Sequence, residues 1–189
     1  NQTVIKDSVN AFEINQAFSY SFWMTFPEPF ARATILGTED GNFDLVPGYY
    51  LYIEEDKLAF QLSSTWDYNY IKVKTKEPFP FNKWAHVTLT YDGSAQAAGV
   101  KLYVDGNLQE LNVLKDNLTK TIRRYASWFK IGHYSLQGGA IDEFRQYNRV
   151  LTLPEIQSLA NQPVTEKGWF DYYVYNEDEK LNYLRDSLR

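Results

Sequence analysis

Apolar and polar residues alternate along most of the chain with the period of two that a half-buried β-strand requires. The clearest case runs from Phe18 to Met24, where every second residue is large and apolar. The turn pairs Asp92-Gly93 and Asp105-Gly106 separate such segments. Further strands are predicted at residues 48–53, 58–63, 70–74, 84–91, 100–104, 127–132 and 140–147. Many short strands without intervening helices predict an all-β jelly-roll sandwich of two antiparallel sheets.

The pattern changes towards the C-terminus. Thr152-Leu153-Pro154-Glu155 combines an N-cap hydroxyl, an early proline and a capping glutamate, which predicts a helix over residues 153–160. Leu181, Leu184 and Leu188 then recur at helical spacing. We therefore predict a jelly-roll domain over residues 1–162 and a helical C-terminal appendage or linker over residues 163–189.

Aromatic residues are unusually frequent in this 189-residue chain, with 5 Trp, 15 Tyr and 12 Phe. The length suffices for one sizeable core. The strand positions expected to contribute to the core or its borders are Trp84, Val87, Leu89, Leu102, Val104, Ile131, Ile141 and Phe144. Aromatic side chains favour pleated, half-buried surfaces, so their excess supports the prediction of strands. It also leaves rings available for an exposed binding face.

Charge and cysteine content exclude several classes of function. The net charge of −5 argues against a nucleic-acid partner, because neutralising phosphates requires a basic surface. The absence of cysteine excludes disulfides, thiolate zinc sites and a cysteine nucleophile, and it fits a periplasmic or cell-surface protein. There is no run of about 18 apolar residues, so we predict no membrane span. The chain starts at Asn1 without a signal-like segment, which suggests an excerpt of a longer protein.

Two segments of the chain contain motifs that are similar to those of a known family. Residues 83–93 contain Trp84, His86 and the closing Tyr-Asp-Gly of a W-x-H-V-x-x-x-Y-D-G strand, and residues 101–106 follow with Leu-Tyr-Val-Asp-Gly. Residues 138–156 contain a G-x-I-D-E-x-R-x-Y strand and an R-x-L-x-x-x-E-I helix start. In these segments the chain resembles the laminin G-like branch of the concanavalin A-like lectin/glucanase superfamily. The resemblance implies the jelly-roll fold, but its members include lectins, carbohydrate-binding modules, adhesion domains and spacers.

The C-terminal segment carries a second resemblance. Tyr172-Tyr173-Val174 and Leu181-x-x-Leu184-Arg185 are similar to a segment of large exported bacterial multidomain proteins, in which a laminin G-like domain sits between other domains. This resemblance implies neighbouring domains within a longer chain. It also implies a periplasmic, cell-surface or extracellular location.

Catalysis is not expected, although relatives in the superfamily include glucanases. Retaining glycosidases need two carboxylates about 5–5.5 Å apart, and the glucanase relatives place theirs in an E-x-D-x-x-E run that this chain lacks. Asp142 and Glu143 are adjacent, so a strand would point them to opposite faces. Glu54 and Asp56 fall on a predicted hairpin tip. We predict no enzyme, and a glucan hydrolase is the least favoured alternative.

Calcium is the one cofactor that the resemblance implies. Relatives hold a structural Ca²⁺ with an aspartate of the closing strand, and Asp142 matches that position. The alternative is that Asp142 anchors the neighbouring turn through backbone hydrogen bonds.

Ligand binding is predicted from aromatic rings placed beside polar side chains. Trp66, Tyr68 and Tyr70 alternate with Asp67 and Asn69, which would align three rings if the segment is extended. Sugars stack their C–H faces on such rings, while nearby polar groups bond their hydroxyls. The alternative is that these rings fill the core or cover its edge. Two further candidates flank the late strand, Trp128 and Tyr134.

These observations favour a non-catalytic recognition module with a polysaccharide or other glycan as its ligand. The alternative is a structural or protein-interaction domain that positions neighbouring domains. Asn117-Leu118-Thr119 also matches a glycosylation sequon, which matters only in a eukaryotic secretory context.

Overall fold

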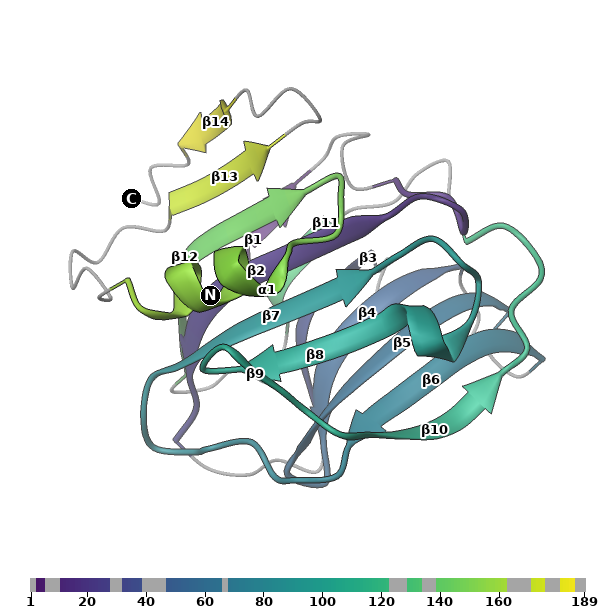
Figure 1. Cartoon of the computed structure of the whole chain (residues 1–189), viewed down its shortest axis with the longest axis horizontal. Coiled ribbons are helices and arrows are strands. Elements are labelled where there is room, and N and C mark those ends of the chain that lie inside the picture. The colour runs from purple at the N-terminus through teal and green to yellow at the C-terminus, as the bar shows by residue number, and fades with distance from the viewer. Residues whose placement is uncertain are drawn as a thin grey trace.

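Two seven-stranded sheets pack face to face in the computed structural model (Figure 1). The structure describes residues 3–5, 11–27, 32–38, 47–65, 68–122, 129–133, 139–162, 171–175 and 181–185. The predicted jelly-roll sandwich is confirmed.

Sheet A has the strand order β1-β11-β3-β4-β5-β6-β10, and each neighbouring pair is antiparallel. Its strands are β1 (Thr3–Ile5), β3 (Arg32–Thr38), β4 (Gly48–Glu54), β5 (Lys57–Thr65), β6 (Asn69–Thr75), β10 (Leu111–Asp116) and β11 (Phe129–His133).

Sheet B has the order β14-β13-β12-β2-β7-β8-β9. Its strands are β2 (Phe18–Thr25), β7 (Ala85–Tyr91), β8 (Val100–Val104), β9 (Asn107–Leu108), β12 (Ala140–Tyr147), β13 (Asp171–Tyr175) and β14 (Leu181–Arg185). A short 3-10 helix, η2 (Ala97–Gly99), precedes β8, and the α-helix α1 (Leu153–Ala160) follows β12. No helix in the described ranges is long and apolar enough to cross a bilayer.

The core lies between the sheets and is unusually aromatic. Phe18, Tyr20 and Phe22 of β2 point into it and are fully buried, as the alternation predicts. Of the predicted core residues, only Trp84 is substantially exposed, at 37%, because it precedes β7 rather than lying within it. The other predicted core residues are buried in the core or pack against it: Val87, Leu89, Leu102, Val104, Ile131, Ile141 and Phe144.

The C-terminal segment differs from its predicted helical structure. β13 pairs in parallel with β12, and β14 closes an antiparallel hairpin on β13, seen in yellow at the edge of sheet B in Figure 1. The helical prediction is therefore wrong for residues 171–175 and 181–185. The edge of β12 offers ladder hydrogen bonds, and the Tyr- and Val-rich segment Tyr172–Tyr175 favours strands over helix. The domain boundary at residue 162 stays a prediction.

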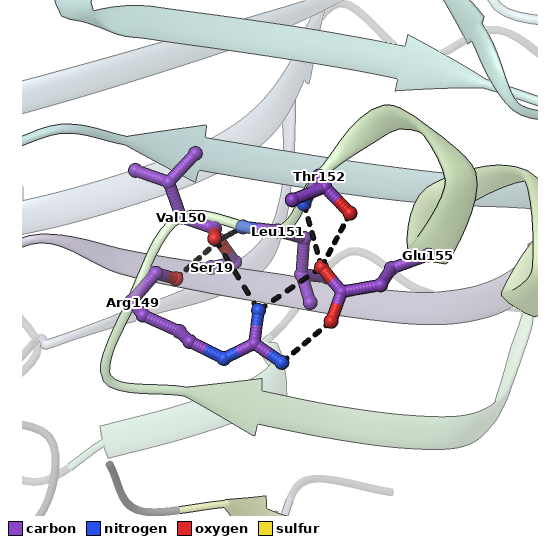
Figure 2. A network of polar contacts seen from close by, with 6 residues as sticks. All are labelled: Ser19, Arg149, Val150, Leu151, Thr152 and Glu155. Carbon is purple, nitrogen blue, oxygen red and sulfur yellow. Dashed lines mark hydrogen bonds and ion pairs between the residues drawn. The ribbon is translucent and has the colours of Figure 1, made fainter.

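Helix α1 covers part of the outer face of sheet B. A network of polar contacts connects the start of α1 to β2 (Figure 2). We call this network the helix latch, and its members are Ser19, Arg149, Thr152 and Glu155. The Ser19 hydroxyl donates to the Arg149 carbonyl oxygen (2.7 Å) and accepts the Leu151 N–H (3.1 Å). Arg149 binds both carboxylate oxygens of Glu155 (3.0 and 2.6 Å). The Thr152 N–H donates to the same carboxylate (2.7 Å), completing the predicted capping box.

Candidate functional site

Tyr68 is the most exposed large hydrophobic side chain of the described residues, at 79%. It lies in the turn between β5 and β6, and its N–H donates to the Thr65 carbonyl oxygen (3.4 Å). An aromatic ring held out from a hairpin turn in this way is available for stacking against a ligand.

Tyr70 has a different environment from Tyr68. It lies within β6, opposite Ser63 of β5, and is partly buried. The ammonium group of Lys115 from β10 lies over its ring, 5.9 Å from the centroid. Because Tyr68 sits in a turn, the predicted extended alternation does not place it on one face with Tyr70.

The backbone on both sides of Asn69 is held by a side chain from a distant segment. The Asn117 amide nitrogen donates to the Tyr68 carbonyl oxygen (2.7 Å), and its amide oxygen accepts the Tyr70 N–H (3.1 Å). The sequence identified Asn117 only as part of a sequon. Asparagine side chains often bond turn backbones in this way. Because Asn117 is far from Tyr68 and Tyr70 in sequence, no local pattern predicted the contact.

The remaining predicted ligand-binding residues lie outside the described residues: Trp66, Asp67, Trp128 and Tyr134. They stay predictions.

The outer face of sheet A adjoins this turn and is rich in polar groups. Among the described residues, buried side-chain atoms of this face without a hydrogen-bond partner include Thr34 Oγ1, Gln61 Nε2 and Ser63 Oγ. Unpaired buried polar groups cost about 1–3 kcal/mol each. A ligand would reach these atoms only after neighbouring side chains moved, whereas the exposed ring of Tyr68 needs no such change.

Glu54, one of the two carboxylates considered at this hairpin tip, contacts two lysines, and its neighbour Glu55 contacts one. Glu54 binds Lys72 (3.0 Å) and Lys74 (3.4 Å), and Glu55 binds Lys74 (2.9 Å). The hydrogen bond from Lys74 lowers the pKa of Glu55. A retaining glycosidase needs two carboxylates that face each other across the substrate, whereas Glu54 faces the ammonium groups of Lys72 and Lys74.

The second pair of adjacent carboxylates is also engaged. Glu143 bonds to Arg145, and the Asp142 carboxylate accepts the Glu143 N–H (2.8 Å) at a bulge where Glu143 has φ of 52°. Asp142 thus makes the backbone contact that the alternative to a metal site predicts. Among the described residues, no group of three or more His, Cys, Asp or Glu side chains could hold a metal ion. The described donors do not fit a carboxylate-rich calcium site, and calcium at Asp142 stays a prediction from the resemblance.

His86 is a structural residue of sheet B. It is fully buried, its Nε2 lies 2.9 Å from the Ser21 hydroxyl, and the Trp23 ring packs edge-on against it at 5.3 Å. Burial, aided by the positive charge of Arg145, lowers the pKa of His86 from 6.5 to about 4. The ring is therefore neutral at pH 7 and inaccessible to a substrate.

Comparison with protein families identifies the fold's relatives. A laminin G family model, described as the concanavalin A-like lectin/glucanases superfamily, matches residues 1–157. The chain belongs to this superfamily. Comparison with curated proteins found no match.

Solved structures similar to this member of the superfamily include binding domains of botulinum neurotoxins. One is the binding domain of botulinum neurotoxin DC in complex with rat synaptotagmin II (TM-score 0.61, 18% identity, covering 85% of this chain and 39% of that chain). Another is the binding domain of botulinum neurotoxin serotype D (TM-score 0.60, 18% identity, covering 85% and 40%). A third is described as "Cell entry of botulinum neurotoxin type C is dependent upon interaction with two ganglioside molecules" (TM-score 0.58, 17% identity, covering 85% and 39%). The chain thus spans about two fifths of the length of these structures, and at this identity the likeness shows the fold alone.

Proposed function

We propose that this chain is a non-catalytic carbohydrate-binding module in which the ring of Tyr68 stacks on a sugar. The observation that carries the proposal is a ring exposed at 79% on a turn residue, Tyr68, whose carbonyl oxygen is bonded by the Asn117 side chain. Tyrosine offers a large contact area with few rotatable bonds, so ordering it on a ligand costs little entropy.

The environment of the turn suits a sugar better than an apolar ligand. The side-chain amides of Asn69 and Asn117 hold the backbone beside the ring, and the ammonium group of Lys115 lies over the neighbouring Tyr70 ring. The proposed contacts follow the general pattern of ring stacking with polar groups nearby. Trp66 and Asp67, which precede Tyr68 directly, belong to the same proposed site.

The similar structures support a binding role in general terms. Two of them are described as binding domains, and the description of the third names an interaction with ganglioside molecules. Because this chain spans only about two fifths of the length of each structure, the ligands named for those proteins are not assigned to this chain. Placement outside the cytoplasm, within a longer multidomain protein, is part of the same proposal.

A glycan array probed with the intact chain, with calcium present, tests the proposed function. We expect wild type and Trp84→Ala to bind the same glycans and Tyr68→Ala to bind none. Trp84 is a matched control because it is an exposed aromatic residue directly before β7, a strand of the other sheet. Absence of binding by wild type, or equal binding by Tyr68→Ala, would contradict the proposal.

A protein-interaction role is the second candidate, and a specific observation favours it. Strands β9 and β10 form the edges of sheets B and A, and they expose Leu108, Val113 and Leu114 at 50–58%. Sheet edges with exposed apolar side chains are typical contact sites for other chains. Leu108→Ser combined with Leu114→Ser should abolish co-sedimentation with a neighbouring domain if this role is correct, and should leave glycan binding unchanged.

A further inference from the structure

The ladder between β6 and β10 ends just before the turn that carries Tyr68. Its last register pair is Asp116 with Ile71, and one further backbone bond runs from the Asn117 N–H to the Tyr70 carbonyl oxygen (3.2 Å). Beyond this point, side chains replace the backbone ladder.

Two asparagines make these replacement contacts, and we call them the asparagine clamp, Asn69 and Asn117. Asn117 bonds the Tyr68 carbonyl oxygen (2.7 Å) and the Tyr70 N–H (3.1 Å), which flank Asn69. Asn69 in turn accepts the N–H groups of Thr119 (3.1 Å) and Lys120 (3.0 Å).

The amide nitrogen of Asn69 completes the reciprocal arrangement. It donates to the Asn117 carbonyl oxygen (3.0 Å) and to the Thr119 hydroxyl (2.8 Å). Each asparagine therefore binds the backbone around the other, across about 50 positions of sequence. An amide side chain suits this role because it donates and accepts at once.

We infer that Asn69 and Asn117 are positioning residues for ligand binding, fixing the turn so that the Tyr68 ring is presented in one place. This inference rests on the proposed function for its ligand readout. Preorganisation raises affinity by removing the ordering cost that a flexible loop would impose on binding. It also gives the sequon residues Asn117 and Thr119 a structural role, since both already take part in the clamp.

Hydrogen exchange tests the clamp without any ligand. In wild type, the backbone N–H groups of Tyr70, Thr119 and Lys120 should be protected because each is bonded by a clamp side chain. Asn117→Ala should accelerate exchange at Tyr70, and Asn69→Ala should accelerate it at Thr119 and Lys120. Asn69→Asp keeps the acceptor for both N–H groups, so it should lose less protection than Asn69→Ala.

Affinity for an array-selected glycan supplies the second readout. We expect Asn117→Ala and Asn69→Ala to weaken binding roughly tenfold with the melting temperature little changed, and Asn69→Asp to recover part of the loss. Asn107→Ala is the matched control, because Asn107 is an exposed asparagine that bonds the Asp105 carbonyl oxygen in the other sheet. It should bind as wild type does.

The outcomes separate the two proposals. If Tyr68→Ala loses binding while both clamp variants bind as tightly as wild type, the positioning role is wrong and the carbohydrate site stands. If wild type binds no glycan, the proposed function is wrong. Unchanged exchange in the clamp variants would then overturn the clamp as well.

Discussion

The helix latch and the asparagine clamp are built from the same kind of contact but lie in opposite environments. Each joins segments far apart in sequence through side-chain hydrogen bonds to backbone groups. The latch starts from Ser19, which is fully buried, and leads to Ile156, which is buried among Tyr103, Tyr147 and Leu151. The clamp lies at the surface and leads to Tyr68, which is exposed.

This difference separates contacts that stabilise the fold from contacts that present a surface. A buried polar group that loses its partner incurs the full cost of desolvation, whereas an exposed one regains water. The latch should therefore control the free energy of unfolding, and the clamp should control ligand affinity. Substitutions in the latch and at Tyr68 test this division.

Ile156→Ala should be the most destabilising change in the latch region. Its side chain is fully buried between α1 and the outer face of sheet B, so truncation leaves a cavity and should cost about 2–5 kcal/mol of unfolding free energy. Denaturant unfolding measures the loss. Leu153→Ala on the same helix is the control, since Leu153 is about half exposed, and a similar loss in both variants would contradict the account.

Acid should destabilise the face of sheet B beneath α1 through His86. The pKa of His86 is about 4 in the folded protein and 6.5 ordinarily, so the unfolded state binds the proton more tightly. The free energy of unfolding therefore has its full value above pH 6.5. It decreases as the pH falls towards 4, because the unfolded state takes up the proton first. The complete loss would be about 3 kcal/mol.

An NMR titration of the two histidines measures this directly, with His133→Gln used to assign their signals. A His86 pKa near 6.5 would show that the ring is not held neutral by burial. The exposed clamp should show no comparable pH dependence in this range, because its contacts are made by uncharged amides.

Ser19→Ala should have an intermediate effect. It removes the partner of the Arg149 carbonyl oxygen and of the Leu151 N–H at a buried position, at a cost of about 1–3 kcal/mol. Thermal or denaturant unfolding checks the value against Ser158→Ala, an exposed serine on α1. If Ser19→Ala matched this control, the latch would contribute nothing to stability.

The period-two pattern predicted those parts of the fold whose strands have one buried face. Phe18 to Met24 became β2 with the expected inward side chains, and Thr152 with Glu155 marked the start of α1. Strands β1, β3, β9 and β10 were missed. In β10, Leu111–Asp116 lies at a sheet edge with mostly exposed side chains and a bulge, so no alternation marks it. The leucine spacing beyond residue 180 predicted a helix. Instead, β13 pairs with β12 and β14 pairs with β13, so both strands belong to sheet B.

The candidate site was predicted only in part, because its geometry depends on a contact between distant segments. The alternation of aromatic and polar residues identified Tyr68 as a ligand candidate, and the structure shows that its ring is exposed. The sequence did not reveal that Tyr68 lies in a turn, or that Asn117 bonds the backbone there. Side-chain bonds between residues about 50 positions apart have no local signature.

Calorimetric titration of Tyr68→Ala with an array-selected glycan, beside wild type and Tyr68→Phe, tests whether the ring of Tyr68 binds sugar. We predict that Tyr68→Ala loses measurable binding while its unfolding free energy stays within about 0.5 kcal/mol of wild type, as expected for an exposed side chain. Tyr68→Phe, which keeps the stacking ring, should retain most of the affinity. Wild-type affinity in Tyr68→Ala would contradict the assignment of sugar binding to this turn.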